Sequence, residues 1–333
     1  MELKNLGEFG LIDLLKEDTI HEPGTVVAGI GDDAAVLLPT PRQLQLVTTD
    51  MMVEGIHFTL ATTTAAQLGY KAIAVNLSDI AAMGGIPRHA VVSIALPPDT
   101  PVDFVVSLYE GMKEICRVHN VNIVGGDTVA SKSGLVINVA VLGEVEPANV
   151  VRRSGAMPGD IVAVTNTLGG SAAGLDLLTQ GEWEQYEFAW PLVTAHLTPR
   201  PQVKAGQYLA CHGASSMDDV SDGLASELHE IASASNVSLF VRGDTIPLSA
   251  EVKQAAAFFH KNPLDYALYG GEDFQLLFTM NPEQFQQLQA ADTGAVFVAI
   301  GEVLPPGKGV VMIDEKEDMH LLQPRGYNHF ASD

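Results

Sequence analysis

The chain has 333 residues, enough for two domains, and 47% of them are hydrophobic, enough to fill two cores. Its 18 basic and 41 acidic residues give a formal net charge of −23, which argues against a nucleic-acid partner or an anionic membrane surface. Cys116 and Cys211 lack the spacing of a zinc site or a disulfide scaffold. With no signal-peptide pattern and no apolar run of transmembrane length, the sequence predicts a cytoplasmic protein.

Strands and helices alternate along the chain, which predicts an α/β or α+β fold. In the first half, strands are expected at 45–49, 90–96, 121–124 and 136–142, with helices at 64–83 and 104–119. The first of these helices ends at Gly84-Gly85. A boundary is expected near 147–160. Beyond it, strands are expected at 161–165, 238–241, 274–280 and 297–300, and helices at 171–179, 201–212, 224–235 and 283–290.

The two halves echo each other. Each contains a Gly-Gly motif next to an acidic residue, a strand and a Gly-Glu-Val sequence, at 125–145 and 270–303. Two related halves and chance similarity of short glycine motifs explain this pattern about equally well.

Six short stretches place aspartates beside glycine, serine or threonine at the edge of an apolar run: 29–33, 48–50, 76–79, 125–128, 218–223 and 270–273. Each stretch alone is more typical of a turn or a helix cap than of a ligand site. Together they suggest a site for Mg²⁺, which prefers carboxylates combined with substrate phosphates. An acidic protein that binds a nucleotide also needs cations between the two negative charges. The first hypothesis is therefore an enzyme that uses a magnesium nucleotide.

Three local patterns refine this hypothesis. Asn76 and Asp79 share one face of a predicted helix, flanked by apolar residues, so a buried polar face is slightly favoured over an exposed polar stripe. Asp219 and Asp222 flank Ser221, where metal binding and helix capping are compatible roles. The run 169–174 lacks the Gly-Lys-Ser/Thr ending of a P-loop, which favours a tight turn with close helix packing over a phosphate site.

These motifs, in this order, closely resemble those of the thiamine-monophosphate kinases, in the superfamily that includes aminoimidazole ribonucleotide synthetase. The resemblance runs from about residue 7 to residue 330, and its most specific parts are 29–33, 48–58, 70–84, 125–128, 153–160, 220–224 and 270–274. It implies ATP-dependent phosphorylation of thiamine monophosphate to thiamine diphosphate, assisted by several Mg²⁺ ions. It also implies an N-terminal α/β domain, 1–150, that binds ATP and Mg²⁺ and whose strands pair across a homodimer. A second α/β domain, 151–333, would complete the active-site cleft.

The resemblance also assigns residues by position. The implied Mg²⁺ ligands are Asp33, Thr48, Thr49, Asp50, Asp79, Asp127, Asp219 and Asp222. The implied ATP contacts are Tyr109, Gly126, Asp127, Arg153 and Ser221, and the implied thiamine-monophosphate contacts are His57, Glu272 and Tyr327. Asp222, Asp219 and Arg153 are the residues expected to act directly on the phosphoryl transfer.

Two positions depart from the family pattern. Asp218 stands where an apolar residue is common, and Tyr327 stands where tryptophan is common, although tyrosine can also stack on an aromatic ring.

Alternative functions remain open. Selenophosphate synthase and the hydrogenase-maturation enzyme are disfavoured because the cysteines they need are absent. An aminoimidazole ribonucleotide synthetase-like enzyme and a non-catalytic Mg-nucleotide sensor remain.

Overall fold

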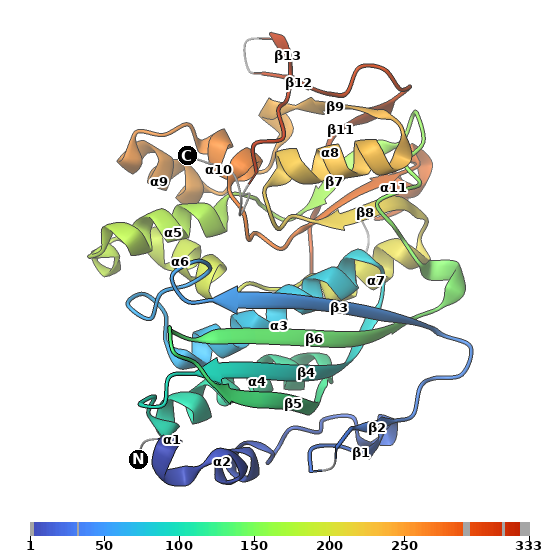
Figure 1. The fold of residues 1–333 in the computed structure, drawn as a ribbon. Coiled ribbons are helices and arrows are strands. Elements are labelled where there is room, and N and C mark those ends of the chain that lie inside the picture. Colours follow the sequence, from blue (N-terminus) through green and yellow to red (C-terminus); the bar gives the residue numbers. More distant parts are fainter. Residues whose placement is uncertain (1–2, 32, 289–293, 315–316, 327–333) are drawn as a thin grey trace. The chain divides into compact units, whose positions relative to one another are not determined.

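A computed structural model describes residues 3–31, 33–288, 294–314 and 317–326 (Figure 1). The chain divides into two compact units. Unit 1 comprises Met1–Ile80 and Gly85–Ala148, and unit 2 comprises Ala81–Gly84 and Asn149–Asp333. Both units combine a β-sheet with helices, which confirms the predicted mixed fold class. No helix in the described part of the chain is long and apolar enough to cross a membrane.

Unit 1 is built on a four-stranded sheet in the order β3–β6–β4–β5. The strands are β3 (Leu44–Val53), β4 (Ile86–Leu96), β5 (Asn122–Ala130) and β6 (Val136–Val145). Only the β4–β5 pair is parallel. Helices α3 (Ala65–Ala82) and α4 (Val102–His119) lie behind this sheet in Figure 1. The N-terminal elements are α1 (Leu3–Leu6), α2 (Glu8–Leu15), η1 (Pro23–Thr25), β1 (Val26–Ala28) and β2 (Val36–Leu37), and η2 (Pro147–Asn149) follows β6.

Two glycines allow α3 and α4 to pack closely. A Cβ atom at Gly69 would lie 1.8 Å from the carbonyl oxygen of Leu108, and one at Gly111 would lie 1.8 Å from that of Ala66. Any side chain at either position would therefore push the helices apart, because core packing leaves no room for an added methyl group.

The sheet of unit 1 has two different faces. Along β3, Val47 and Met51 are 71% and 55% exposed, whereas Met52 is 5% exposed, as the two-residue period of a strand predicts. In the strand register, Met51 pairs with Asn138 of β6, and Asn138 pairs with Ser93 of β4, so these residues lie on the same exposed face. We call this side, marked by Val47 and Met51, the open face; the other side faces the helices.

Unit 2 contains a seven-stranded mixed sheet in the order β13–β12–β9–β11–β7–β10–β8. The strands are β7 (Ile161–Thr165), β8 (Ala214–Asp219), β9 (Ser238–Arg242), β10 (Leu276–Met280), β11 (Phe297–Leu304), β12 (Val310–Ile313) and β13 (Met319–Leu321). The helices are α5 (Gly170–Gln180), α6 (Ala189–Leu197), α7 (Val203–Cys211), α8 (Leu224–Ser235), α9 (Ala250–Phe259), α10 (Pro263–Tyr269) and α11 (Pro282–Leu288), with short turns η3 (Trp183–Gln185) and η4 (Gly243–Thr245).

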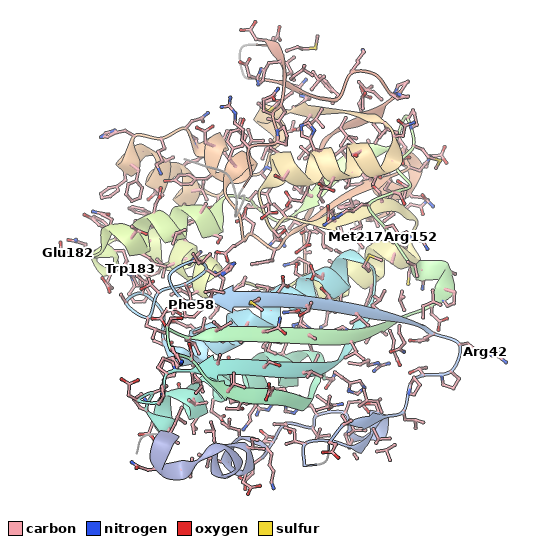
Figure 2. All side chains as sticks on the ribbon, in the orientation of Figure 1. Arg42, Phe58, Arg152, Glu182, Trp183 and Met217 are labelled. Carbon is pink, nitrogen blue, oxygen red and sulfur yellow. The ribbon has the colours of Figure 1, made fainter. Side chains whose placement is uncertain are left out.

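Two hydrophobic clusters lie among the described residues of unit 2. In the first, Leu228 and Ile231 of α8 are fully buried against strand residues such as Val164 and Leu239. The second joins α5, α6 and α9. Trp183 packs at the edge of this second cluster, with its ring 4.8 Å from that of Trp190 in an edge-to-face arrangement (Figure 2 labels Trp183). The first cluster anchors α8, whose start carries part of the candidate site.

Candidate functional site

In unit 1, β3 and α3 bring three of the predicted ligands together. Thr48 and Asp50 lie on the helix-facing side of β3, and the Thr48 hydroxyl donates a hydrogen bond to the Asp79 carboxylate of α3. Burial, together with the negative charge of Asp79, raises the pKa of Asp50 to about 6. Asn76, one turn before Asp79, is fully buried, as expected for a buried polar face. Two carboxylates and a hydroxyl thus form an oxygen-rich group that favours a cation.

Two predicted ligands of unit 1 lie elsewhere. The Thr49 hydroxyl donates to the Val139 carbonyl at 3.0 Å and accepts from the Asn138 side chain at 3.0 Å, on the open face. Asp127 pairs with Ser93 in the strand register, which continues through Asn138 to Met51 on the same open face. Within unit 1, Asp127 is therefore not grouped with Asp50 and Asp79. Asp33 is exposed in the loop between β1 and β2.

The expected nucleotide contacts of unit 1 differ in accessibility. Tyr109 of α4 is 7% exposed, and burial raises the pKa of its phenol to about 12. Gly126, by contrast, is exposed on β5. A Cβ atom there would lie 1.8 Å from the Val92 carbonyl oxygen, so this strand position requires glycine.

His57 lies in the turn that follows β3. The Val53 amide donates to its Nδ1 at 3.0 Å, and the His57 amide donates to the Val53 carbonyl at 2.9 Å. These bonds fix the ring and leave Nε2 as the nitrogen that carries the proton in the neutral form. A nearby cavity of about 400 Å³ is lined by Glu54, Asp99, Thr100 and apolar residues, and none of its lining residues is a predicted site residue.

In unit 2, Arg153 is positioned at the end of β8. The Met217 amide of β8 donates to the Arg152 carbonyl at 3.0 Å, which brings the chain around Arg152 alongside this strand (Figure 2). Arg153 then forms an ion pair with Asp218, with an Nε–Oδ2 distance of 2.9 Å. Burial raises the pKa of Asp218 to about 6, and the guanidinium opposes that rise. The extra acid noted in the sequence is thus a partner for Arg153.

The turn after β8 carries Ser221 and Asp222. It is tied to a second loop, because the Glu272 amide donates to the Ser221 carbonyl at 2.7 Å and the Phe274 amide donates to the Val220 carbonyl at 2.8 Å. Asp219 at the end of β8 is 4% exposed. The structure therefore brings Arg153, Asp219, Ser221, Asp222 and Glu272, all predicted site residues, to one end of the unit 2 sheet.

Glu227, in the first turn of α8, was not predicted as a site residue from the sequence. It is 4% exposed, and its Oε1 accepts from the Asp222 amide at 2.8 Å. Burial raises the pKa of Glu227 to about 8, and the negative charges of Asp218 and Asp222 also raise it, whereas the hydrogen bond from the Asp222 amide lowers it. A sequence signal existed, since an acid in the first helical turn often reaches back to the preceding amides.

His196 of α6 was also missed, and it carries no sequence signal. Its Nδ1 lies 3.3 Å from the Glu272 carboxylate and 3.0 Å from the Ser171 hydroxyl, and its side chain is buried. Glu272 itself has a left-handed backbone, with φ of +68°. Such strain in a non-glycine residue is common at functional sites.

Asp273 occupies the N-terminus of α5. Its carboxylate accepts from the Gly169 amide at 2.6 Å and the Ser171 amide at 3.1 Å, while burial raises its pKa to about 7. A Cβ atom at Gly174 would lie 2.2 Å from the Leu192 carbonyl oxygen. The run 169–174 is therefore a tight turn with close helix packing, as predicted, and a protein carboxylate takes the place that a phosphate takes in a P-loop.

The donor set fits Mg²⁺ in its chemistry, because the grouped ligands offer only carboxylate and hydroxyl oxygens. Within the described residues, no group of three or more His, Cys, Asp or Glu side chains is close enough to hold a metal ion. Mg²⁺ does not need such a cage, since it usually retains several waters and binds through one or two carboxylates together with substrate phosphates.

Comparison with known proteins decides the family. Residues 31–145 match the model of the AIR synthase related protein, N-terminal domain, and residues 157–314 match the C-terminal domain of the same family. A thiamine-monophosphate kinase of Bacillus subtilis is 39% identical over 330 residues, covering 98% of this chain and all of the relative. The chain belongs to the thiamine-monophosphate kinase family.

Solved structures of this family have the same fold. The thiamine-monophosphate kinase of Stenotrophomonas maltophilia matches with a TM-score of 0.83 and 33% identity, covering 94% of this chain and 97% of its own. A ThiL protein complexed with AMPPCP and TMP matches with a TM-score of 0.79 and 35% identity, covering 99% of both chains. The resemblance to the thiamine-monophosphate kinases inferred from the sequence is thereby confirmed.

Proposed function

We propose that this protein transfers the γ-phosphoryl group of ATP to the phosphate of thiamine monophosphate, giving thiamine diphosphate and ADP. The observation that carries the proposal is 39% identity to a thiamine-monophosphate kinase over 98% of this chain. The relative of the same fold that is complexed with AMPPCP and TMP supports the two substrates, since AMPPCP is an ATP analogue and we take TMP to be thiamine monophosphate.

The chemistry needs little from the protein beyond positioning and charge. A phosphate oxygen of thiamine monophosphate forms a bond to the γ-phosphorus, and the bond from that phosphorus to the bridging oxygen of ADP breaks. The attacking phosphate is already largely ionised at neutral pH, because its second pKa is ~6. No strong general base is therefore required, which agrees with a predicted site that lacks an obvious nucleophile.

We assign the metal-binding role to carboxylates of both units: Asp33, Asp50, Asp79, Asp127, Asp219 and Asp222, with hydroxyl support from Thr48. For Thr49 we assign the backbone oxygen, since its hydroxyl is hydrogen-bonded to the Val139 carbonyl and the Asn138 side chain. Bound Mg²⁺ ions would neutralise the charge that develops on the transferring phosphoryl group and align the two substrates. Arg153, paired with Asp218, is the side chain we assign to a phosphate contact.

The remaining assignments concern substrates. We assign Gly126, Asp127, Ser221 and Tyr109 to ATP; because Tyr109 is buried, it contributes as a wall of the site. We assign His57 and Glu272 to thiamine monophosphate, with the fixed His57 ring and the His196–Glu272 contact as support. Tyr327, the third expected substrate contact, lies outside the described residues and stays a prediction from the sequence.

We further propose that the protein acts as a homodimer, joined through the open face of unit 1, in the cytoplasm. The exposed apolar side chains Val47 and Met51 support the first point, because a functional monomer rarely leaves such a sheet face in water. The free thiols Cys116 and Cys211 support a reducing compartment.

The test is incubation of the purified protein with ATP, Mg²⁺ and thiamine monophosphate, followed by chromatography of the products. We expect ADP and thiamine diphosphate in equal amounts, and none when a chelator removes Mg²⁺. ADP without thiamine diphosphate would instead indicate a relative with another acceptor. Binding of Mg-ATP without any turnover would indicate a nucleotide sensor.

A further inference from the structure

Glu227 is a buried acid beside the turn that carries Ser221 and Asp222. Its side chain is 4% exposed, and the neighbouring Asp218 and Asp219 are 3% and 4% exposed. Burying a further carboxylate in such a place is costly unless its oxygens are bonded. The partners of its two oxygens therefore reveal what the side chain does.

One oxygen of Glu227 holds the turn. Oε1 accepts from the Asp222 amide at 2.8 Å and lies 3.5 Å from the Ser221 hydroxyl. On its other side, the same turn is held by the Glu272 amide, which donates to the Ser221 carbonyl at 2.7 Å. Glu227 thus sets the backbone from which the Asp222 carboxylate projects.

The second oxygen of Glu227 is not used by the fold. Oε2 is buried, and no residue that the structure describes donates a hydrogen bond to it. A cap for the Asp222 amide needs only one acceptor oxygen, so this second one is left for a donor that arrives with a ligand. Carboxylates of this kind commonly bond to the waters and ligands around a metal ion.

We propose that Glu227 is a positioning residue for the metal-binding turn: Oε1 orients Asp222, and Oε2 accepts a hydrogen bond from a water bound to Mg²⁺. The inference rests on the proposed function, since Asp222 is assigned there to the metal. It adds a residue that was not among the site residues predicted from the sequence or implied by the family resemblance.

The decisive variant is Glu227→Gln, because it keeps an acceptor for the Asp222 amide and replaces Oε2 by a donor. Calorimetry with Mg²⁺ and the non-hydrolysable analogue AMPPCP measures binding without turnover. We expect the dissociation constant to rise about 10-fold, the usual effect of losing such a partner. The Mg²⁺ concentration for half-maximal activity should rise by a similar factor, while the KM for thiamine monophosphate and the unfolding midpoint without ligands stay near the wild-type values.

Glu251→Gln is the matched control, because Glu251 is the first-turn acid of α9, outside the residues assigned to the site. It should leave Mg-AMPPCP binding unchanged. Glu227→Met, which removes both oxygens at similar length, should weaken binding at least as much as Glu227→Gln. If both Glu227 variants bind Mg-AMPPCP like the wild type and only their unfolding midpoint falls, Glu227 is a helix cap and the inference is overturned. A wild-type protein that does not bind Mg-AMPPCP would instead overturn the proposed function, and the inference with it.

Discussion

Adjacent side chains of β3 point to opposite faces of the sheet and make different contacts there. Thr48 and Asp50 face α3, where they meet Asp79, whereas Thr49 bonds to Val139 and Asn138 on the open face. The two-residue period of a strand imposes this separation. Three consecutive polar residues therefore do not act as one ligand set through their side chains.

Asp222 provides the most direct test of the metal assignment at this scale. Asp222→Asn removes one negative charge while its backbone amide can still donate to Glu227. We expect kcat to fall by about 100-fold with the thermal unfolding midpoint retained, because charge stabilisation of the phosphoryl transfer is lost. Steady-state kinetics at saturating Mg²⁺ would measure this, and a kcat equal to that of the wild type would remove Asp222 from the metal site.

Glu144 of β6 provides a prediction about pH. It accepts bonds from the Thr40 amide at 2.8 Å, the Thr40 hydroxyl at 2.6 Å and Arg88 Nε at 3.1 Å. Burial opposes its charge, but these bonds and that from Gln45 outweigh burial and lower the pKa of Glu144. Because the folded pKa lies below the unfolded value, the stabilisation is present above the unfolded pKa of ~4.3 and is lost as pH falls through the folded pKa.

Glu144→Gln should therefore lower the free energy of unfolding at pH 7 by roughly 1.5–3 kcal/mol, the usual value for charged hydrogen bonds. The difference from the wild type should shrink as pH falls below about 4. Denaturant unfolding at several pH values would measure it. Glu146→Gln is the control, since Glu146 is exposed and bonds only weakly to Gln43 at 3.2 Å. A difference that stays constant down to the lowest pH would contradict the role given to the Glu144 charge.

At the scale of elements, the sequence predicts several helices and strands from their apolar pattern and misses others, among them α9 and β8. The predicted helix 224–235 and strand 161–165 coincide with α8 and β7. β8 was not predicted, because its sequence Ala-Ser-Ser-Met-Asp-Asp is polar although the strand is largely buried. The Ser216 hydroxyl of β8 is hydrogen-bonded to the Thr279 hydroxyl of β10 at 2.7 Å, and only the fold brings these two residues together. The His196–Glu272 contact was missed for the same reason.

Close packing of α3 on α4 gives a prediction at the same scale. Gly111→Ala would place a methyl carbon 1.8 Å from the Ala66 carbonyl oxygen, so the helices must separate. We expect a loss of about 3 kcal/mol in the free energy of unfolding, at the upper end for overpacking. Denaturant unfolding followed by circular dichroism would measure it.

Gly24→Ala is the control for this packing. Its added Cβ atom would meet only the Glu22 side chain, at 3.6 Å, which is an ordinary contact, and Gly24 has no positive φ. This variant should change the free energy of unfolding by less than about 1 kcal/mol. An equal loss in both variants would mean that helix separation is not the cause.

For the whole molecule, the open face of unit 1 predicts association of two chains. Val47→Glu would place a charge on that face, which is costly when the face is buried in an interface. We expect the wild type to sediment as a dimer and Val47→Glu to sediment as a monomer at the same micromolar concentration.

Val118→Glu is the matched control for the dimer prediction. Val118, on α4, is 70% exposed, compared with 71% for Val47, but it does not lie on the sheet. This variant should remain dimeric. Dissociation of both variants, or of neither, would remove the open face as the dimer interface.

The protein has two tryptophans, Trp183 and Trp190, and they pack against each other beside the α5–α6–α9 cluster of unit 2. Intrinsic tryptophan fluorescence therefore reports only on unit 2, whereas far-ultraviolet circular dichroism reports on the helices and strands of both units. During denaturation, coincident curves from the two signals would indicate that the units unfold together. A fluorescence change at a different denaturant concentration would reveal a partly folded state with one unit still intact, without the need for any introduced label.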